Sequence, residues 1–261
     1  MSWSKDFYPA MSVDELREKA RKALRDAAGR GRHLSPVEVS GRTICRTWWG
    51  KAWCSNMEQY LDYENRLPRG RSYVRNGAVI DLVMGEGKVT ALVQGSRSRP
   101  YKVEIKVKPL GQVKMKKVSA LCSRQLDSLE ELVKGKFPEA LETLLTEEGA
   151  LFPSLKEISF DCSCPDWARM CKHVAAVMYG IGVRLDENPF YFFILRGIDP
   201  EALLKRTVED HVEKLLAHRD VKNDRIIDDE DMEKLFHLEG GGQRPLSAYG
   251  YPLSGGKGSI V

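Results

Sequence analysis

Three cysteines and one histidine, Cys162, Cys164, Cys171 and His173, lie within one short segment and constrain the fold more than any other feature of the chain. Apolar and polar residues alternate just before them, so Cys162 and Cys164 are predicted to project from the same face of a strand. Cys171 and His173 are also two residues apart, a spacing that points side chains in nearly opposite directions inside a helix. We therefore expect both in the turn that opens the following apolar helix, so that a strand, a loop and a helix start surround one site.

Three thiolates and one imidazole form a donor set that suits tetrahedral zinc. Four protein ligands leave no position for a catalytic water, so the predicted ion, one Zn2+ in each chain, is structural. Iron–sulfur clusters usually take four cysteines, and a disulfide is disfavoured in a reducing compartment. The alternative is a group of buried free cysteines beside a surface histidine.

The ligand spacing, C-x-C and then after six residues C-x-H, resembles that of the SWIM zinc finger. Outside the finger, the segments TWWGKAW, RGRSYVR and VQGSRSRPYKV are similar to segments of bacterial and archaeal SWIM-containing proteins. The resemblance covers residues 42–200. It implies binding to DNA or to proteins, and an association with helicase-like ATPases of the Swi/Snf type. DNA and such an ATPase are therefore the expected partners.

Hydrophobic periodicity predicts the elements before the finger. Ser12 followed by Glu15 is a capping box that opens a charged helix. Trp49, Trp53 and Met57 share one helical face and are expected in the core. The segments AVIDLVM, KVTALVQ and YKVEIKVK alternate as strands do, and a glycine-rich turn joins the first two, which predicts an antiparallel meander.

These signals predict an α+β fold, in which an antiparallel β-meander with helices is followed by a mainly helical part carrying a Cys3His zinc finger. We expect a charged helical segment over 1–40 and a basic region, a helix plus the meander, over 41–117. A helical region over 118–239 would carry the finger at 158–182. A flexible tail is expected over 240–261, which holds seven glycines and two prolines.

Charge is unevenly distributed along the chain. Residues 66–120 hold 13 Lys and Arg against three Asp and Glu, whereas residues 121–261 hold 17 against 25. The basic middle predicts contact with phosphates. The candidate residues are Arg66, Arg69, Arg71, Arg75, Arg97, Arg99, Lys102 and Lys106. The loop between the two ligand pairs, residues 165–170, is called the finger loop. It adds the candidate contacts Asp166, Trp167 and Arg169. An ordinary solvated face, or an acidic protein partner, would explain the same charges.

No catalytic constellation emerges from the sequence. Cys45, Cys54 and Cys122 are expected to be isolated, buried thiols. No glycine-rich phosphate loop with Lys-Ser/Thr is present, so any ATP would be used by a partner. Without an apolar run of spanning length or an export signal, we expect a cytoplasmic protein with no membrane contact.

The sequence therefore predicts a zinc-binding accessory protein, not an enzyme, that uses the finger and a basic sheet surface to bind DNA, a helicase-like ATPase or both. One rival interpretation is a purely protein-binding adaptor without nucleic-acid contact. A second rival is a thiol-redox or hydrolytic enzyme.

Overall fold

The computed structural model describes residues 11–59, 66–123, 131–132, 134–137, 142–146, 151–166, 168 and 170–217. The chain divides into two compact units, Met1–Glu213 and Lys214–Val261. The fold reported below belongs to the first unit, and the described part of the second is the end of one helix. Among the described helices, none has the length and apolar composition to cross a membrane.

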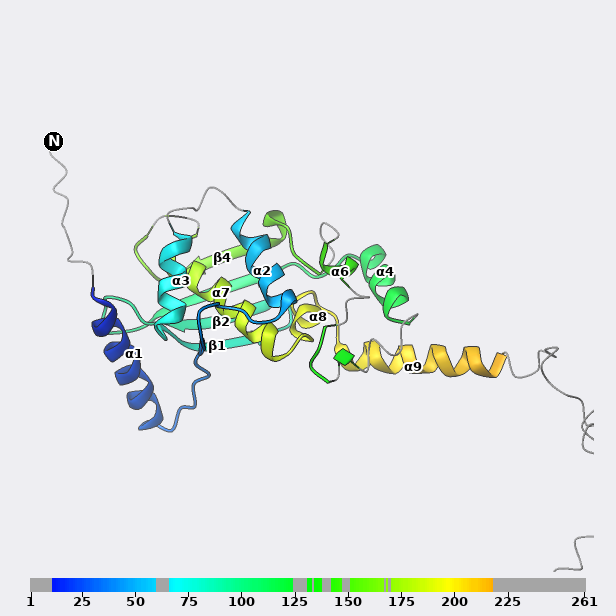
Figure 1. Cartoon of the computed structure of the whole chain (residues 1–261), viewed down its shortest axis with the longest axis horizontal. Helices are drawn as coiled ribbons and strands as arrows, with labels where there is room; N and C mark the ends of the chain where they lie inside the picture. Colours follow the sequence, from blue (N-terminus) through cyan, green and yellow to red (C-terminus); the bar gives the residue numbers. More distant parts are fainter. Residues whose placement is uncertain are drawn as a thin grey trace, which may run out of the picture. The chain divides into compact units, whose positions relative to one another are not determined.

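A four-stranded antiparallel sheet in the order β1-β2-β3-β4 lies at the centre of the first unit (Figure 1). The strands are β1 (Val79–Gly85), β2 (Lys88–Val93), β3 (Tyr101–Val107) and β4 (Ile158–Cys162). The first three form the predicted meander, and Gly87, with φ of 59°, lies in the tight turn between β1 and β2. β4 pairs with β3 across the boundary predicted at residue 118, so the strand of the finger belongs to the same sheet.

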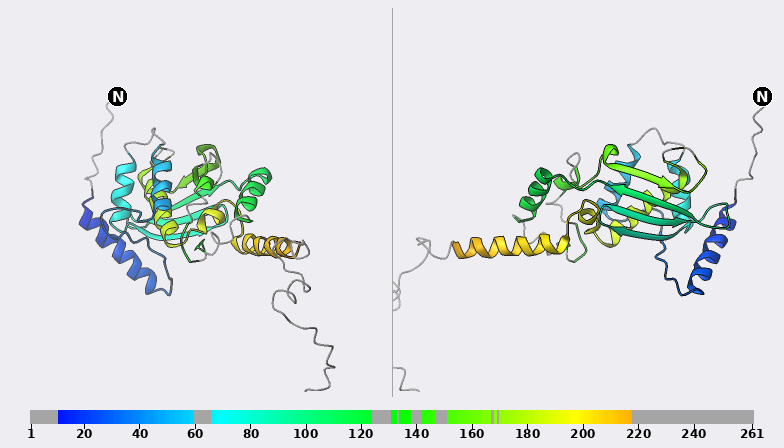
Figure 2. Two further views of the ribbon diagram at one scale, coloured as in Figure 1. Left: turned by 45° about the vertical axis from the view of Figure 1, so that its right-hand side comes forward. Right: turned by 180° about the vertical axis from the view of Figure 1, so that it is seen from behind.

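Helices α2, α3 and α7 cover one face of this sheet, and the opposite face, called the outer face below, is turned toward the viewer in the right-hand view of Figure 2. The helices are α1 (Val13–Ala28), α2 (Trp48–Glu58), α3 (Leu67–Arg75), α4 (Gln112–Ser123), α6 (Thr143–Thr146), α7 (Lys172–Glu187), α8 (Tyr191–Leu195) and α9 (Pro200–Ala217), with a 3-10 turn, η3, at Leu155–Glu157. The predicted mixed α+β class is therefore confirmed.

Helix α7 is the centre of the core, since the sheet packs on one side of it and α2 and α3 pack on the other. It is buried along most of its length, as its apolar sequence predicts. Gly70 of α3 permits a close crossing, because a Cβ at that position would lie 2.6 Å from the Cβ of Ala175. Trp53 of α2 is buried as predicted, and its indole N–H donates to the carbonyl of Met178 at 2.9 Å.

The capping box of α1 is present as predicted. The Ser12 hydroxyl accepts from the Glu15 N–H at 3.2 Å, and the Glu15 carboxylate accepts from the Ser12 N–H at 2.9 Å. Leu16 and Ala20 are the buried residues of this otherwise charged helix, which contacts β1.

The structure differs from the sequence prediction mainly at α3. This segment was expected to enter the meander, and no helix was predicted for it. It contains Pro68 and Gly70. Proline is tolerated in a first helical turn, and the glycine is required by the crossing with α7. The helix expected from residue 118 begins at Gln112. The short acidic helix expected around residues 228–239, and the tail, lie outside the described residues.

A buried ion pair joins η3 to the segment after α8. The Arg196 side chain is fully buried, and its guanidinium lies 2.8 Å from the Glu157 carboxylate and 2.7 Å from the carbonyl of Lys108. The Ser154 N–H also donates to Glu157, at 2.9 Å. Burial alone would raise the pKa of Glu157, but the hydrogen bonds from Arg196 and Ser154 outweigh it and lower that pKa.

Glu157→Gln is expected to lower the free energy of unfolding at pH 7 by about 2 kcal/mol, because it removes the charged partner of a buried guanidinium. The pKa of Glu157 is lower in the folded than in the unfolded chain. The ion pair therefore stabilises fully above the unfolded value of about 4.3, and this stabilisation is lost as pH falls through the folded value. Urea unfolding at a series of acid pH values should show a weaker pH dependence in the variant. Glu86→Gln, in the exposed β1–β2 turn, is the control, and equal pH dependence in both variants would contradict the assignment.

Candidate metal centre

The four predicted ligands come from the end of β4 and the start of α7. Cys162 is the last residue of β4, Cys164 follows it, Cys171 is the N-cap of α7, and His173 lies in the first turn of that helix. Cys171 has an extended backbone, with φ of −81° and ψ of 171°. Because this backbone is not helical, the Cys171 side chain can lie on the same side as that of His173. The structure thus brings all four side chains together.

The geometry of the group fits one metal ion. The ligand atoms of the four residues all lie within 4.8 Å of one another. Nδ1 of His173 is 3.9 Å from the sulfur of Cys162 and 3.8 Å from that of Cys171. A tetrahedral ion with metal–sulfur bonds of about 2.3 Å and metal–nitrogen bonds of about 2.0 Å would place sulfur and nitrogen roughly 3.5 Å apart. The two sulfur–nitrogen distances exceed this spacing by only a few tenths of an ångström.

The start of α7 favours a thiolate at Cys171. The N–H of Val174 donates to this sulfur at 3.5 Å, at the positive end of the helix dipole. The hydrogen bond with Cys162 lowers the pKa of Cys171 and raises that of Cys162. Burial raises the pKa of Cys164. The Cys171 thiol is thus readily deprotonated to the thiolate, which is the form that binds a metal ion.

Aromatic packing fixes the orientation of the His173 ring. Tyr101 stacks on it with a centroid distance of 4.3 Å, and Tyr73 meets it edge-on at 5.5 Å. Nδ1 faces the sulfurs, whereas Nε2 is buried and has no hydrogen-bond partner among the described residues. A Cβ on Gly95 would lie 2.5 Å from the Tyr101 ring and 3.1 Å from Nε2. Because Gly95 has no side chain, the stacked rings of Tyr101 and His173 can occupy this space.

The finger loop is attached to α3 through one of its predicted contact residues. The Asp166 carboxylate lies 3.0 Å from the guanidinium of Arg66 and accepts from the N–H of Ala168 at 3.2 Å. Both charged residues are half-buried. Asp166 and Arg66 thus hold the loop in place. The other two predicted loop contacts, Trp167 and Arg169, lie outside the described residues.

The three arginines of α3 that were predicted to contact phosphates have different environments. Arg71 donates to the Tyr179 hydroxyl at 2.7 Å and pairs with Glu58, so it connects α3 to α7 and α2. Arg75 is exposed and donates to a backbone carbonyl of the preceding loop at 2.7 Å. Arg69 is exposed. Arg71 therefore has a structural role that its sequence context did not indicate.

The basic residues predicted around β3 separate into two groups. Arg97 lies over the Tyr101 ring at 5.6 Å, and Lys106 pairs with Glu104 at 3.1 Å, so both interact with their own neighbourhood. Arg99 and Lys102 are exposed and line a groove together with residues of α1. The sequence predicted a basic sheet surface here but not the contribution of α1.

Two hydrogen bonds between Ser163 and Lys102 link the metal group, which is Cys162, Cys164, Cys171 and His173, to β3. The N–H of Lys102 donates to the Ser163 hydroxyl at 2.9 Å, and the N–H of Ser163 donates to the Lys102 carbonyl at 3.0 Å. Ser163 lies between Cys162 and Cys164. Any ion held by these cysteines would therefore also fix the position of Lys102.

The expectation that Cys45 and Cys54 are isolated thiols is wrong. Their sulfurs lie 3.3 Å apart, next to Gly182 of α7, because α2 folds back over the segment that precedes it. The hydrogen bond with Cys54 and burial raise the pKa of Cys45, which disfavours the thiolate that redox exchange or nucleophilic attack requires. Cys122 is buried elsewhere, and burial raises its pKa to about 12. No spacing signal in the sequence would have paired Cys45 with Cys54.

The chain is similar to an uncharacterized protein, Rv2102, of Mycobacterium tuberculosis. The two are 41% identical over 163 residues, which cover 62% of this chain and 58% of the relative. The match therefore spans less than two thirds of the relative's own length. No family model matches the chain, and no solved structure matches it.

Gly95→Ala is expected to weaken metal binding about tenfold, because the added Cβ displaces Tyr101 and His173 from the positions that orient Nδ1. Overpacking at this site should also cost about 1–3 kcal/mol of stability. Competition with a colorimetric chelator measures the first effect and thermal unfolding the second. Gly111→Ala is the matched control, since no atom lies within 4 Å of its Cβ position. Unchanged metal affinity in Gly95→Ala would show that the rings do not position the ligand.

Proposed function

We propose that this chain is a zinc-binding accessory protein that binds nucleic acid and acts beside an ATPase partner. The observation that carries the proposal is the Cys3His group at the junction of β4 and α7. Its donor atoms lie close enough for one ion, and the elements that hold them also support the basic residues of β3. The metal group and the basic surface therefore belong to one structural unit.

Zinc is the ion that this donor set favours. Three thiolates and one imidazole at tetrahedral spacing are typical of structural zinc sites, in which protein atoms fill every coordination position. Such an ion polarises no substrate, so it would act by joining the sheet to α7. We accordingly propose a non-catalytic protein.

Nucleic acid is the partner that the charge distribution favours. Residues 66–120 carry 13 Lys and Arg and three Asp and Glu. Of the predicted contacts in this region, Arg69, Arg75, Arg97, Arg99, Lys102 and Lys106 are exposed, although Lys106 pairs with Glu104. Arginine forks and lysine ammonium groups bind phosphate oxygens without reading bases. The proposed binding is therefore electrostatic and independent of sequence.

A helicase-like ATPase of the Swi/Snf type is proposed as the protein partner, since the ligand spacing resembles that of SWIM fingers. The sequence has no phosphate-binding loop of its own. In this arrangement the partner would supply ATP hydrolysis, and this chain would hold the nucleic acid. A purely protein-binding adaptor is the alternative that the binding experiment below separates from this proposal.

Purified protein is expected to contain one zinc ion for each chain, measured by elemental mass spectrometry. Cys171→Ser should lower the zinc content more than about tenfold and decrease the thermal stability, because the fold then lacks the join between β4 and α7. Cys122→Ser is the control, because this cysteine is buried outside the group. Full stability of Cys171→Ser together with absence of zinc from the wild type would refute the structural zinc site.

The wild-type protein is expected to bind labelled DNA with an affinity that falls steeply as salt rises, because lysine and arginine contacts release counterions from phosphates. Fluorescence anisotropy over a potassium chloride series, with a single strand and with a duplex, measures this dependence. Absence of binding to both at low salt would exclude the nucleic-acid function and leave the adaptor.

A further inference from the structure

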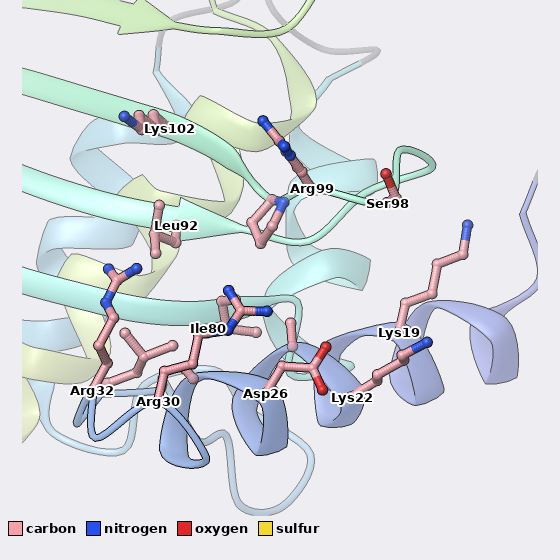
Figure 3. A pocket seen from close by; sticks show the side chains of 14 residues that line it. Lys19, Lys22, Asp26, Arg30, Arg32, Ile80, Leu92, Ser98, Arg99 and Lys102 are labelled. Carbon is pink, nitrogen blue, oxygen red and sulfur yellow. The ribbon is translucent and has the colours of Figure 1, made fainter.

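A groove of about 750 Å³ runs between α1 and the outer face of the sheet (Figure 3). One wall is α1 with the segment that follows it. The other wall is the β2–β3 loop and the start of β3, and it includes Arg99 and Lys102. The two walls are more than 50 residues apart in the sequence, so the groove exists only in the folded protein.

Basic side chains from both walls face this groove (Figure 3). They are Lys19, Lys22, Arg30, Arg32, Arg99 and Lys102. The acidic residue of the lining is Asp26. Lys22, Arg30, Arg99 and Lys102 are exposed, and no described acidic side chain forms an ion pair with any of the four. Their charges are therefore available to an anionic ligand.

The floor of the groove is apolar. Leu34, Ile80, Leu92 and Pro100 contribute to it, and the lining includes no aromatic residue. Proteins that bind bases in single strands stack them on aromatic rings, usually beside a positive groove that follows the backbone. This groove has the positive lining but no aromatic ring on which a base could stack. It is therefore suited to phosphates, with sugars against the apolar floor, and not to the recognition of particular bases.

The dimensions of the groove favour a single strand. A hollow of this size matches sites that hold a ligand of a few hundred daltons, which corresponds to a short stretch of one strand. The arginines also favour a phosphodiester over an acidic peptide, because the planar guanidinium pairs two of its N–H groups with two oxygens of one phosphate.

We propose that this groove binds the phosphodiester backbone of single-stranded nucleic acid, with α1 on one side of the strand and the β2–β3 loop on the other. The inference rests on the proposed function, whose site it specifies. It also assigns a role to the charged helix at the start of the chain, which the predicted nucleic-acid contacts did not include.

The metal centre supports the wall of the groove that contains Arg99. Arg97, two residues earlier, lies over Tyr101, and Tyr101 stacks on the ligand His173. The opposite wall is joined to the same loop, because the Lys19 ammonium donates to the carbonyl of Ser96 at 2.8 Å. The two walls are therefore linked through Lys19 and Ser96, and the β2–β3 loop is linked to His173 through Arg97 and Tyr101.

The test compares two variants of the full chain in which four cations are replaced by glutamine. The groove variant carries Lys22→Gln, Arg30→Gln, Arg99→Gln and Lys102→Gln. The control variant carries Lys116→Gln, Lys117→Gln, Lys136→Gln and Lys156→Gln, four exposed positions outside the groove that give the same change in net charge. The probes are a fluorescein-labelled single strand of thymidylates, a duplex of equal length, and labelled polyglutamate.

We expect the groove variant to bind the single strand at least about tenfold more weakly than the wild type. The slope of log affinity against log salt concentration, called the salt slope, should be smaller in magnitude by about 3, because roughly 0.7 counterions are released for each of the four phosphate contacts. The control variant should keep the wild-type slope. Equal single-strand binding by both variants would overturn the groove assignment and leave the proposed function intact, as would binding to the duplex alone.

Absence of binding to either nucleic acid would overturn both the groove assignment and the proposed function. If the groove variant then lost binding to polyglutamate, the groove would instead be a site for acidic protein. All eight substituted side chains are exposed, so both variants are expected to fold. Circular dichroism checks this and separates a loss of contacts from a loss of folding.

Discussion

The convergence of Cys162, Cys164, Cys171 and His173 is the contact on which the rest of this fold depends. It brings the edge strand of the sheet to the first turn of the helix at the centre of the core, and β4 and α7 also pack against each other. Helix α7 lies across all four strands and supports α2 and α3. A metal ion at its first turn would fix the position of the whole helical layer relative to the sheet.

The local environment of the site is consistent with this role. The finger loop is occupied by internal contacts, since Asp166 pairs with Arg66 and accepts from Ala168. The ring of His173 is enclosed by Tyr101 and Tyr73. A recognition surface needs side chains that are free to meet a ligand, and the described part of this loop offers few. Recognition is thus better placed elsewhere on the same unit.

The features that the sequence predicted are those with a local signal. Alternating residues marked the meander, a capping box marked α1, and the spacing of the cysteines marked the metal group. Features that depend on long-range packing were missed. The helix α3 was not predicted, because its first turn contains Pro68 and because the role of Gly70 is defined only by the crossing with α7. The contact between Cys45 and Cys54, and the proximity of α1 to the β2–β3 loop, arise from folding alone.

Charge shows the same limit of sequence reasoning. Clustered arginines in α3 predicted one basic surface, yet Arg66 and Arg71 pair with Asp166 and Glu58 inside the fold. Arg69 and Arg75 of α3 stay exposed, whereas the cations that line the groove come from α1, from the segment after it, and from Arg99 and Lys102, which are far apart in the sequence. Because Lys102 is joined to Ser163, between Cys162 and Cys164, an ion bound by this group would also hold one wall of the groove. The metal centre would then influence nucleic-acid binding without contacting the nucleic acid.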